Sequence, residues 1–393
     1  MSVSIGGYPF FYYLCGHNIT YRKLSVIMMN KNKQCDFRLP AEWEEQSGIM
    51  IAWPHEGTDW APYLEEIEQT YTELVDAITQ YEYVLLLARD PEDVKAKLRK
   101  RLKHLQMRRI IFRQMEFNDT WTRDYGPITL CSHHQTRGFF VPNHMLDFKF
   151  NGWGEKFKAD LDDAVNVRLY YSGIFYGALE NHSDFVFEGG AIDTDGQGTI
   201  FLTRHSQTAP HRNQPLTETE IDSRLRSIFD FADRIVWIEH GELIGDDTDG
   251  HIDTLVRCAP NNTLLYAGTD DESDPQYGEL KLMEDQLKDL RTTDGRLYNI
   301  MRLTLPDPVY YDGERLPATY ANFLVINGAV IVPTYGQPDR DREAMDIIGS
   351  AFPDRTVIGI NSLVTVRQHG SFHCLTMQLP KGLLITENSY MFT

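Results

Sequence analysis

Five residues whose side chains can take part in catalysis recur along the chain at similar intervals. They are Asp124, Glu188, His251, Asn322 and Cys374, and between 52 and 71 residues separate each from the next. A cysteine thiolate is a good nucleophile when a nearby charge lowers its pKa. A histidine can protonate a departing nitrogen and then deprotonate a water molecule. If the fold brings these residues together, they are suited to nucleophilic hydrolysis.

Acidic residues accompany the cysteine and the histidine. Asp124 and Glu188 belong to the spaced set, and Asp253 lies two residues after His251. Several carboxylates around one point repel one another unless they share a cation. A planar guanidinium is the cation whose fork of N–H donors matches paired carboxylates. The combination therefore indicates attack by Cys374 on the carbon of a guanidinium group.

Other interpretations apply to each residue taken alone. Cys374 by itself is more typical of a small buried core residue. The acidic run at residues 246–249 resembles part of a calcium loop, but no glutamate closes a loop of roughly 12 residues. His251 and Asp253 could bind zinc, but no second histidine follows at ligand spacing. A metal-dependent hydrolase or a calcium-binding propeller is thus the alternative of a different class.

The elements that must position these residues follow a repeated order. Strand–strand–helix–strand is predicted three times, about 70 residues apart. The N-terminal part predicts a strand at 49–53, a helix at 62–80, a strand at 83–88 and a helix from 91 to 105. The three repeats comprise strands at 185–187 and 199–203, a helix from 217 and a strand at 234–239; strands at 254–258 and 263–267, a helix through Leu280 and Leu290 and a strand at 300–305; and strands at 322–326 and 329–333, a helix at 339–350 and a strand at 356–360.

Residues at the two ends of the chain supply the remaining copies. Residues 109–141 and 374–393 form partial units if the chain wraps around through the strand at 49–53. A repeat chain whose last unit borrows from its first indicates a closed ring, since closure removes exposed sheet edges. In such a ring the five spaced residues would converge on the axis.

Composition limits the function classes. The chain has 393 residues and a formal charge of −19, and no apolar run is long enough to span a membrane. The acidity and the lack of a basic cluster argue against a nucleic-acid partner and favour a small cationic ligand. Five widely spaced cysteines without a CxxC pair are typical of a reduced, cytoplasmic protein. Residues 1–35 lack periodicity and are expected to be a disordered leader or a misassigned start, followed by one catalytic domain at 36–393.

The sequence resembles the agmatine deiminase and bacterial (Porphyromonas-type) peptidylarginine deiminase family of guanidine-modifying enzymes. The resemblance covers nearly everything after residue 38. It rests on LPAEWEEQSGIMIAWPHEGTDW (39–60), NDTWTRDYGP (118–127), FEGG (187–190), DGQGTIFLT (195–203), GDDTDGHIDT (245–254), NFLVINGAVIVPTYG (322–336) and HGSFHC (369–374).

This resemblance implies a five-fold pseudosymmetric α/β propeller of ββαβ-type units. It implies hydrolysis of a guanidino group to a ureido group and ammonia through a covalent thiouronium on Cys374, with no metal and no cofactor. By the same resemblance His251 is the general acid and base, and Asp124 and Asp253 hold the guanidinium nitrogens. The residues that it places around the substrate are Glu188, Trp121, Asn322 and Asp119.

Substrate is the open question. The first hypothesis is agmatine deiminase, making N-carbamoylputrescine, and the alternative acts on arginine in peptides. An amidinotransferase, in which an amine resolves the intermediate, is a third hypothesis, and a homodimer is compatible with the chain. Agmatine is favoured over free arginine because the α-carboxylate of arginine would enter an acidic site. Arg123 is expected to form an ion pair with Asp124 and therefore not to bind that carboxylate. The family's usual glycine-rich run is replaced here by residues 368–372. This loop is expected to border the pocket entrance, where glycine would allow close backbone approach to a ligand and Ser371 and Phe372 leave fewer options.

Overall fold

The computed structural model describes residues 37–132 and 143–386. The predicted leader, residues 1–35, lies outside this part of the chain. Mixed sheets alternate with helices along the described residues, so the protein belongs to the α/β class. None of the described helices is long and apolar enough to cross a membrane.

The described residues form five sheets of three or four strands and one two-stranded sheet. In the order in which they lie side by side, the strands are β1 (Phe37–Arg38), β5 (Ile128–Ser132), β6 (Asn143–Lys149) and β7 (Gly177–Val186); β10 (Arg234–Ile238), β9 (Thr199–Thr203) and β8 (Ile192–Thr194); β11 (Val256–Ala259), β12 (Thr263–Gly268) and β13 (Asn299–Thr304); β14 (Tyr310–Tyr311) and β15 (Glu314–Arg315); β16 (Leu324–Ile326), β17 (Ala329–Thr334) and β18 (Thr356–Asn361); and β19 (Met377–Pro380), β2 (Gln46–Ala52), β3 (Tyr83–Ala88) and β4 (Ile110–Gln114).

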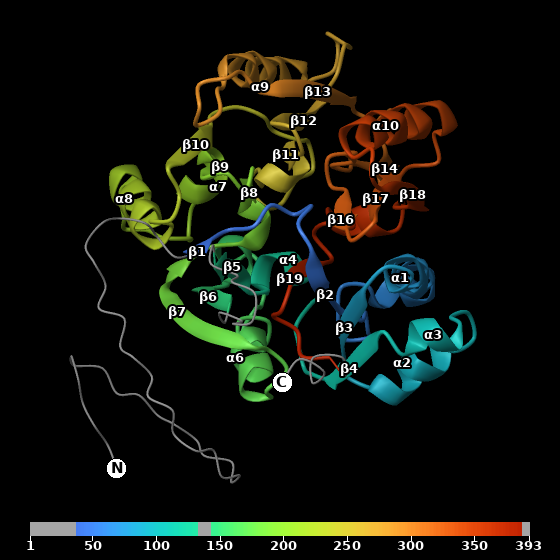
Figure 1. The fold of residues 1–393 in the computed structure, drawn as a ribbon. Helices are drawn as coiled ribbons and strands as arrows, with labels where there is room; N and C mark the ends of the chain where they lie inside the picture. Colours follow the sequence, from blue (N-terminus) through green and yellow to red (C-terminus); the bar gives the residue numbers. More distant parts are fainter. Residues whose placement is uncertain (1–36, 133–142, 387–393) are drawn as a thin grey trace, which may run out of the picture. The chain divides into compact units, whose positions relative to one another are not determined.

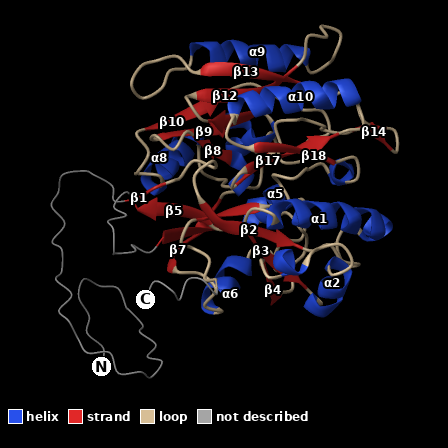
Figure 2. Ribbon diagram, turned by 45° about the vertical axis from the view of Figure 1, so that its right-hand side comes forward, coloured by secondary structure: helices blue, strands red, loops and turns tan. Residues whose placement is uncertain are grey.

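Helices connect these strands. The α-helices are α1 (Leu64–Thr79), α2 (Pro91–Leu98), α3 (His104–Met107), α4 (Thr122–Tyr125), α5 (Gly152–Glu155), α6 (Val165–Tyr171), α7 (Arg204–Thr208), α8 (Glu218–Ile228), α9 (Tyr277–Asp289) and α10 (Pro338–Ala351), and the 3₁₀ turns are η1 (Ala61–Tyr63), η2 (Gly189–Ala191), η3 (Ile252–Thr254) and η4 (Thr365–Gln368). Figure 1 shows α1, α8, α9 and α10 on the outer side of the sheets, with β8, β11, β16 and β19 nearer the middle. In Figure 2, α9 and α10 lie beside the sheets that contain β13 and β18.

All five larger sheets share one pairing pattern. An antiparallel pair is followed by a helical crossover to a parallel strand, as in β11–β12–α9–β13 and β16–β17–α10–β18. The second and third repeats predicted from the sequence are therefore confirmed, and the first is confirmed except for its first strand. The chain also wraps as predicted, because β19 pairs antiparallel with β2 in the sheet that β3 and β4 complete.

Two sequence predictions about elements are wrong, and one unit was predicted only in part. The strand predicted at 185–187 falls at the end of β7, which pairs parallel with β6. The first strand of the next sheet is instead the three-residue β8. The helix predicted from 91 to 105 stops at Leu98, and Leu105 in α3 is 72% exposed, so it does not continue the apolar face. The unit formed by β5, β6, α6 and β7 was predicted only in part, because the partial unit at 109–141 covers β5 and ends before β6.

Local chemistry accounts for the elements that were predicted correctly. The Asp90 side chain accepts hydrogen bonds from the first-turn amides of α2, and Thr217 forms a capping box with Glu220 at the start of α8. The turn at Asn327 and Gly328 closes the β16–β17 hairpin, where Gly328 has a φ of 74°. These signals act within a few residues, so they can be read before the tertiary contacts are known.

Candidate active site

A cavity of about 240 Å³ holds several of the predicted site residues. Its lining comes from segments far apart in the sequence, chiefly the end regions of β4, α4, α5, η3 and η4. The lining residues are Gly57, Asp59, Asn118, Asp119, Trp121, Asp124, Phe150, Trp153, Phe157, Lys158, Asp162, Asp247, Thr248, Thr254, Gln368, His369, Gly370 and Cys374.

Cys374 lies in the turn that leads into β19 and is 5% exposed. The Nδ2 atom of Asn322 donates to Sγ of Cys374 at 3.2 Å. In return, the backbone N–H of Cys374 donates to Oδ1 of Asn322 at 3.3 Å. Oδ2 of Asp253 lies 3.7 Å from Sγ. Burial, with the charges of Asp253 and Asp124, raises the pKa of the Cys374 thiol well above its ordinary value. The free site therefore holds a thiol rather than a thiolate at neutral pH.

His251 precedes η3 and lies between two carboxylates. Its Nδ1 atom is 3.6 Å from Oδ1 of Asp124, and its Nε2 atom is 3.6 Å from Oε2 of Glu188. Burial opposes a charged ring, but Asp124 and Glu188 outweigh it and raise the pKa of His251 to about 9. The imidazole is therefore protonated at neutral pH and can act as a proton donor.

Asp124, in α4, is fixed by two hydrogen bonds. Nε1 of Trp153 donates to Oδ2 at 2.9 Å, and the Gly190 amide donates to Oδ1 at 2.9 Å. A Cβ atom on Gly190 would lie 2.6 Å from Nδ1 of His251 and 2.7 Å from Oδ1 of Asp124, so only glycine fits there. Burial raises the pKa of Asp124, although the charge of His251 opposes the shift. The FEGG segment thus supplies close backbone approach rather than only a tight turn.

Glu188 is fully buried and paired with a residue that the sequence did not single out. Nε of Arg212 donates to both Glu188 oxygens, at 3.0 and 3.1 Å. Arg212 also donates to Oδ2 of Asp249 at 2.6 Å and to the Thr248 carbonyl at 2.7 Å. Burial opposes ionisation of Glu188, but Arg212 holds its pKa below the ordinary value. No motif pointed to Arg212, because its partners lie 24 to 37 residues away.

Asp253 also has a partner that was missed. Nδ1 of His373 lies 2.7 Å from Oδ2 of Asp253, while the buried Oδ1 of Asp253 has no hydrogen-bond partner in the described structure. Burial would raise the pKa of Asp253, but the hydrogen bond and charge of His373 hold it below the ordinary value. The position of His373, directly before Cys374, was the sequence signal that could have identified it.

Trp121 and Asp119 form part of the cavity wall. The Trp121 ring packs against Trp60, with centroids 5.5 Å apart. A Cβ atom on Gly370 would lie 2.3 Å from the Trp121 ring, so the loop before the nucleophile approaches this wall closely. Burial raises the pKa of Asp119 to about 7.

Some expectations about the surroundings are wrong. Ser371 and Phe372 are 2% and 0% exposed and do not line the cavity; the residues of this loop that do so are Gln368, His369 and Gly370. Arg123 forms its ion pair with Glu42, at 3.5 Å, and not with Asp124. In the acidic run at 246–249, Asp246 accepts from Thr248 and Gly250, and Asp249 pairs with Arg212 and Lys156.

The structure thus brings together Asp124, Glu188, His251, Asp253, Asn322 and Cys374, which come from five different sheets or their connections. A family profile described as Porphyromonas-type peptidyl-arginine deiminase matches residues 38–380. The chain belongs to this family.

Relatives of the Porphyromonas-type peptidyl-arginine deiminase family match over nearly their whole length. A Vibrio parahaemolyticus protein provisionally named agmatine deiminase is 31% identical over 88% of this chain and 98% of its own. A solved C. jejuni agmatine deiminase, a cysteine-to-serine variant with substrate bound, is 37% identical, covers 90% of this chain and 100% of its own, and superposes with a TM-score of 0.79. A Porphyromonas gingivalis structure provisionally assigned as an arginine deiminase is 40% identical over 89% of this chain and 100% of its own, with a TM-score of 0.82.

Proposed function

We propose that the protein is an agmatine deiminase, which hydrolyses the guanidino group of agmatine to N-carbamoylputrescine and ammonia. The observation that carries this proposal is the buried cluster around Cys374 and the unused acceptor atom in it. Oδ1 of Asp253 is buried without a hydrogen-bond partner among the described residues, whereas the two N–H groups of protonated His251 face Asp124 and Glu188 at 3.6 Å. Buried polar groups are normally hydrogen-bonded, so a ligand with several N–H donors is expected to complete this site.

A guanidinium fits the charges as well as the hydrogen bonds. The carboxylates of Asp124 and Asp253 both lie close enough to Cys374 for their charges to raise the pKa of its thiol, and the N–H fork of a guanidinium matches paired carboxylates. The arriving positive charge would also lower the pKa of the Cys374 thiol, because it offsets the two carboxylates that raise it. In this proposal the substrate itself helps to form the nucleophile, and the proton of the thiol passes to solvent as the substrate binds.

The proposed reaction then has two halves. The Cys374 thiolate attacks the guanidinium carbon, the bond to one terminal nitrogen breaks, and that nitrogen leaves as ammonia with a proton from His251. The carbon remains bound to Sγ as a thiouronium. Neutral His251 next takes a proton from water, the hydroxide attacks the same carbon, and the carbon–sulfur bond breaks to release the ureido product. The hydroxyl proton of the intermediate passes to the departing sulfur, which restores the thiol.

The acidic side chains of the cavity lining favour agmatine over free arginine. They belong to Asp59, Asp119, Asp162 and Asp247, against a single lysine, Lys158; burial raises the pKa of Asp119 to about 7 and that of Asp162 to about 8, so these two are only partly ionised at neutral pH. Agmatine presents an ammonium group where arginine also carries a carboxylate, and a second carboxylate would be repelled here. The agmatine deiminases among the relatives support the same substrate.

The proposal includes the finer architecture. The five equivalent sheets, and the pairing of β19 with β2, support a closed five-fold propeller formed by one catalytic domain at 36–393. Closure would place Asp124, Glu188, His251, Asn322 and Cys374 around one axis, which agrees with their contacts.

The test is a ureido-product assay on agmatine, free arginine and an N-acylarginine amide, with the Cys374→Ser variant as the blank. We expect agmatine to be turned over best. Preference for the N-acylarginine amide would favour the peptidylarginine alternative, and no product from any of the three would refute deiminase activity.

A further inference from the structure

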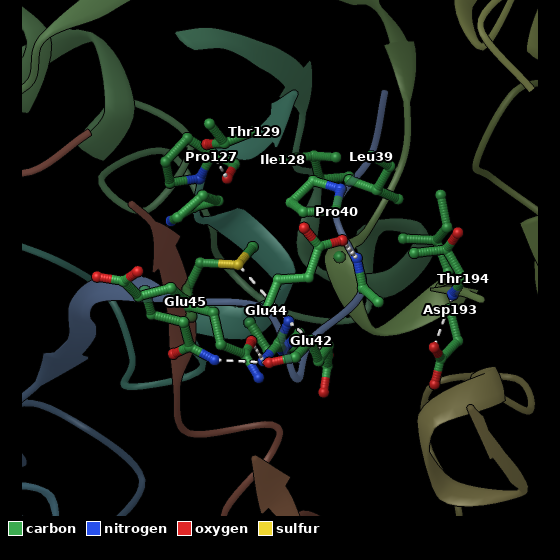
Figure 3. Close-up of a pocket in the computed structure, with 18 residues that line it drawn as sticks. Leu39, Pro40, Glu42, Glu44, Glu45, Pro127, Ile128, Thr129, Asp193 and Thr194 are labelled. Carbon is green, nitrogen blue, oxygen red and sulfur yellow. Dashed lines mark hydrogen bonds and ion pairs between the residues drawn. The ribbon is translucent and has the colours of Figure 1, made fainter. Parts of the chain in front are cut away.

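A second, smaller cavity of about 70 Å³ lies next to residues that support the site, and Glu42 forms part of its lining (Figure 3). Arg123, Gln378 and Met377 also line it. Figure 3 labels Glu42 among the residues that surround this cavity, with Asp193 on the β8 side. Glu42 had no place in the interpretation of the sequence, so its contacts call for an explanation.

Glu42 joins three positively charged or donor side chains. Its Oε1 atom lies 2.7 Å from Nε2 of His373 and 3.5 Å from Nη1 of Arg123, and its Oε2 atom forms an ion pair with Arg257. Arg257 is further fixed by Asp193, 2.9 Å from its Nε atom. Burial alone would raise the pKa of Glu42, but Arg257, His373 and Arg123 together hold it well below the ordinary value. Glu42 is therefore an ionised anchor.

His373 connects this anchor to the reacting group. It is 1% exposed, its Nε2 atom faces Glu42, and its Nδ1 atom faces Oδ2 of Asp253, each at 2.7 Å. An ionised carboxylate only accepts hydrogen bonds, so both ring nitrogens must donate. Oδ2 of Asp253 is also the oxygen that lies 3.7 Å from Sγ of Cys374.

We infer that His373, held by Glu42, is a positioning residue that fixes which oxygen of Asp253 faces the thiol and leaves the other oxygen free for substrate. The bond from His373 occupies Oδ2, while Oδ1 keeps no partner in the described structure. The backbone reinforces the arrangement, because the His373 amide donates to the Asn322 carbonyl at 3.3 Å and Nε of Arg123 donates to the His373 carbonyl at 3.3 Å. The inference rests on the proposed function, since it assigns Asp253 a role in binding a guanidinium.

Two substitutions at His373 separate its two hydrogen bonds. The amide nitrogen of asparagine matches Nδ1, so His373→Asn keeps a donor toward Asp253 and loses the contact with Glu42. Glutamine reaches the position of Nε2, so His373→Gln keeps the contact with Glu42 and loses the donor toward Asp253. If His373 had only a structural role, the two substitutions would reduce kcat/KM about equally.

The experiment measures kcat/KM across pH on the guanidino compound that the wild-type protein turns over best. For His373→Gln we expect a loss of about a hundredfold at neutral pH, as for other misplaced reacting groups. Its acidic limb should move to higher pH, because Asp253 loses the donor that lowers its pKa and must now be ionised by raising the pH. For His373→Asn we expect a loss closer to tenfold and a smaller displacement of that limb.

Glu42→Gln tests the anchor against a matched control. Glu82 is also a buried glutamate, 4% exposed, but it accepts from Asn327 near the β16–β17 hairpin, away from Cys374. Glu42→Gln should displace the acidic limb in the same direction as His373→Gln, whereas Glu82→Gln should leave the pH dependence unchanged. Melting temperatures of all four variants report any loss of folding.

The outcomes separate this inference from the proposed function. Equal, pH-independent losses in His373→Gln and His373→Asn would overturn the positioning role, and an unshifted limb in Glu42→Gln would overturn the anchor. Wild-type protein inactive on agmatine, arginine and the N-acylarginine amide would refute the proposed function, and this inference with it.

Discussion

Arg123 and Asp124 are neighbours in the sequence, yet their side chains line different cavities. Asp124 lines the cavity that contains Cys374, and Arg123 lines the smaller one beside Glu42. Both belong to the four-residue helix α4, in which successive side chains point about 100° apart. A short helix at this point therefore forms part of the wall between the two cavities. The Asp124 side chain lines the cavity that contains Cys374, and the Arg123 side chain pairs with Glu42 beside the smaller cavity.

Replacing the nucleophile should remove turnover and leave the fold intact. In Cys374→Ser a hydroxyl of nearly the same size replaces the thiol but is a far weaker nucleophile, so activity should fall at least about a thousandfold. Circular dichroism and the melting temperature should match the wild type. Mass spectrometry of acid-quenched wild-type protein should find a substrate-derived adduct on the peptide containing Cys374. Substantial turnover by the serine variant would contradict the assignment.

Neutralising Asp253 should make Cys374 more reactive while abolishing turnover. Burial and the charges of Asp253 and Asp124 raise the pKa of the thiol, so removing one of those charges lowers it. Alkylation of Cys374 by iodoacetamide at neutral pH should therefore be faster in Asp253→Asn than in the wild type. Asp274→Asn, which removes a carboxylate paired with Arg315 elsewhere, is the control. A slower reaction in Asp253→Asn would show that its charge does not govern the thiol.

The pH dependence should have a basic limb that belongs to His251. The pKa of this residue is raised to about 9 against the effect of burial, by Asp124 first and Glu188 next. A raised pKa means that the proton is present at neutral pH and is lost as the pH rises through about 9. kcat should fall in that range, and in Glu188→Gln the fall should begin at lower pH because one stabilising charge is gone. Kinetics of both proteins across pH provide the measurement, and a basic limb that does not move would argue against His251 as the proton donor.

Asp247 should contribute to substrate binding more than to the chemical step. Asp247 lines the cavity, and burial raises its pKa to about 6, so it is mostly ionised at neutral pH. Asp247→Asn should raise KM for agmatine about tenfold with a much smaller change in kcat, because Asp247 takes no part in the contacts described for Cys374 and His251. The preference for agmatine over free arginine should shrink as well. An unchanged KM would exclude Asp247 as a partner of the substrate.

A single methyl group at Gly190 should disable the site. Its Cβ atom would lie 2.6 Å from Nδ1 of His251 and 2.7 Å from Oδ1 of Asp124, so these groups must move. Gly190→Ala should destabilise the protein by about 1–3 kcal/mol and reduce activity by at least about a hundredfold. Gly278→Ala is the matched control, because no atom lies within 4 Å of its added Cβ atom, and it should retain full activity. Equal activity of the two variants would contradict the tight packing around His251.

The sequence predicted the parts of the fold that local signals determine. Asp90, Thr217 and the Asn327–Gly328 turn each act within a few residues, and the elements they mark are present. The three-residue strand β8 was missed because so short a segment has no detectable alternation, and its pairing with β9 defines it.

The supporting residues of the site could not be predicted in the same way. Glu42 and His373 are 331 residues apart in the sequence, so no window of sequence contains both. Arg212 likewise acts through Glu188 and Asp249, each in a different connection. The reacting residues were recognisable by their type and spacing, whereas their partners are defined only by the tertiary structure.

The pairing of β19 with β2 has a consequence for how activity arises during synthesis. Residues 46–50 pair with residues 377–380, and Cys374 lies in the turn just before β19. The edge of β2 that pairs with β19 therefore stays unpaired while the ribosome synthesises more than three hundred further residues. A nascent chain can complete the sheets formed by β8–β10, β11–β13 and β16–β18 as these strands are synthesised. It gains Cys374 and the partner strand of β2 together, only when the last part of the chain is made. Premature termination anywhere before residue 374 yields a chain that can fold in part and has no catalytic cysteine.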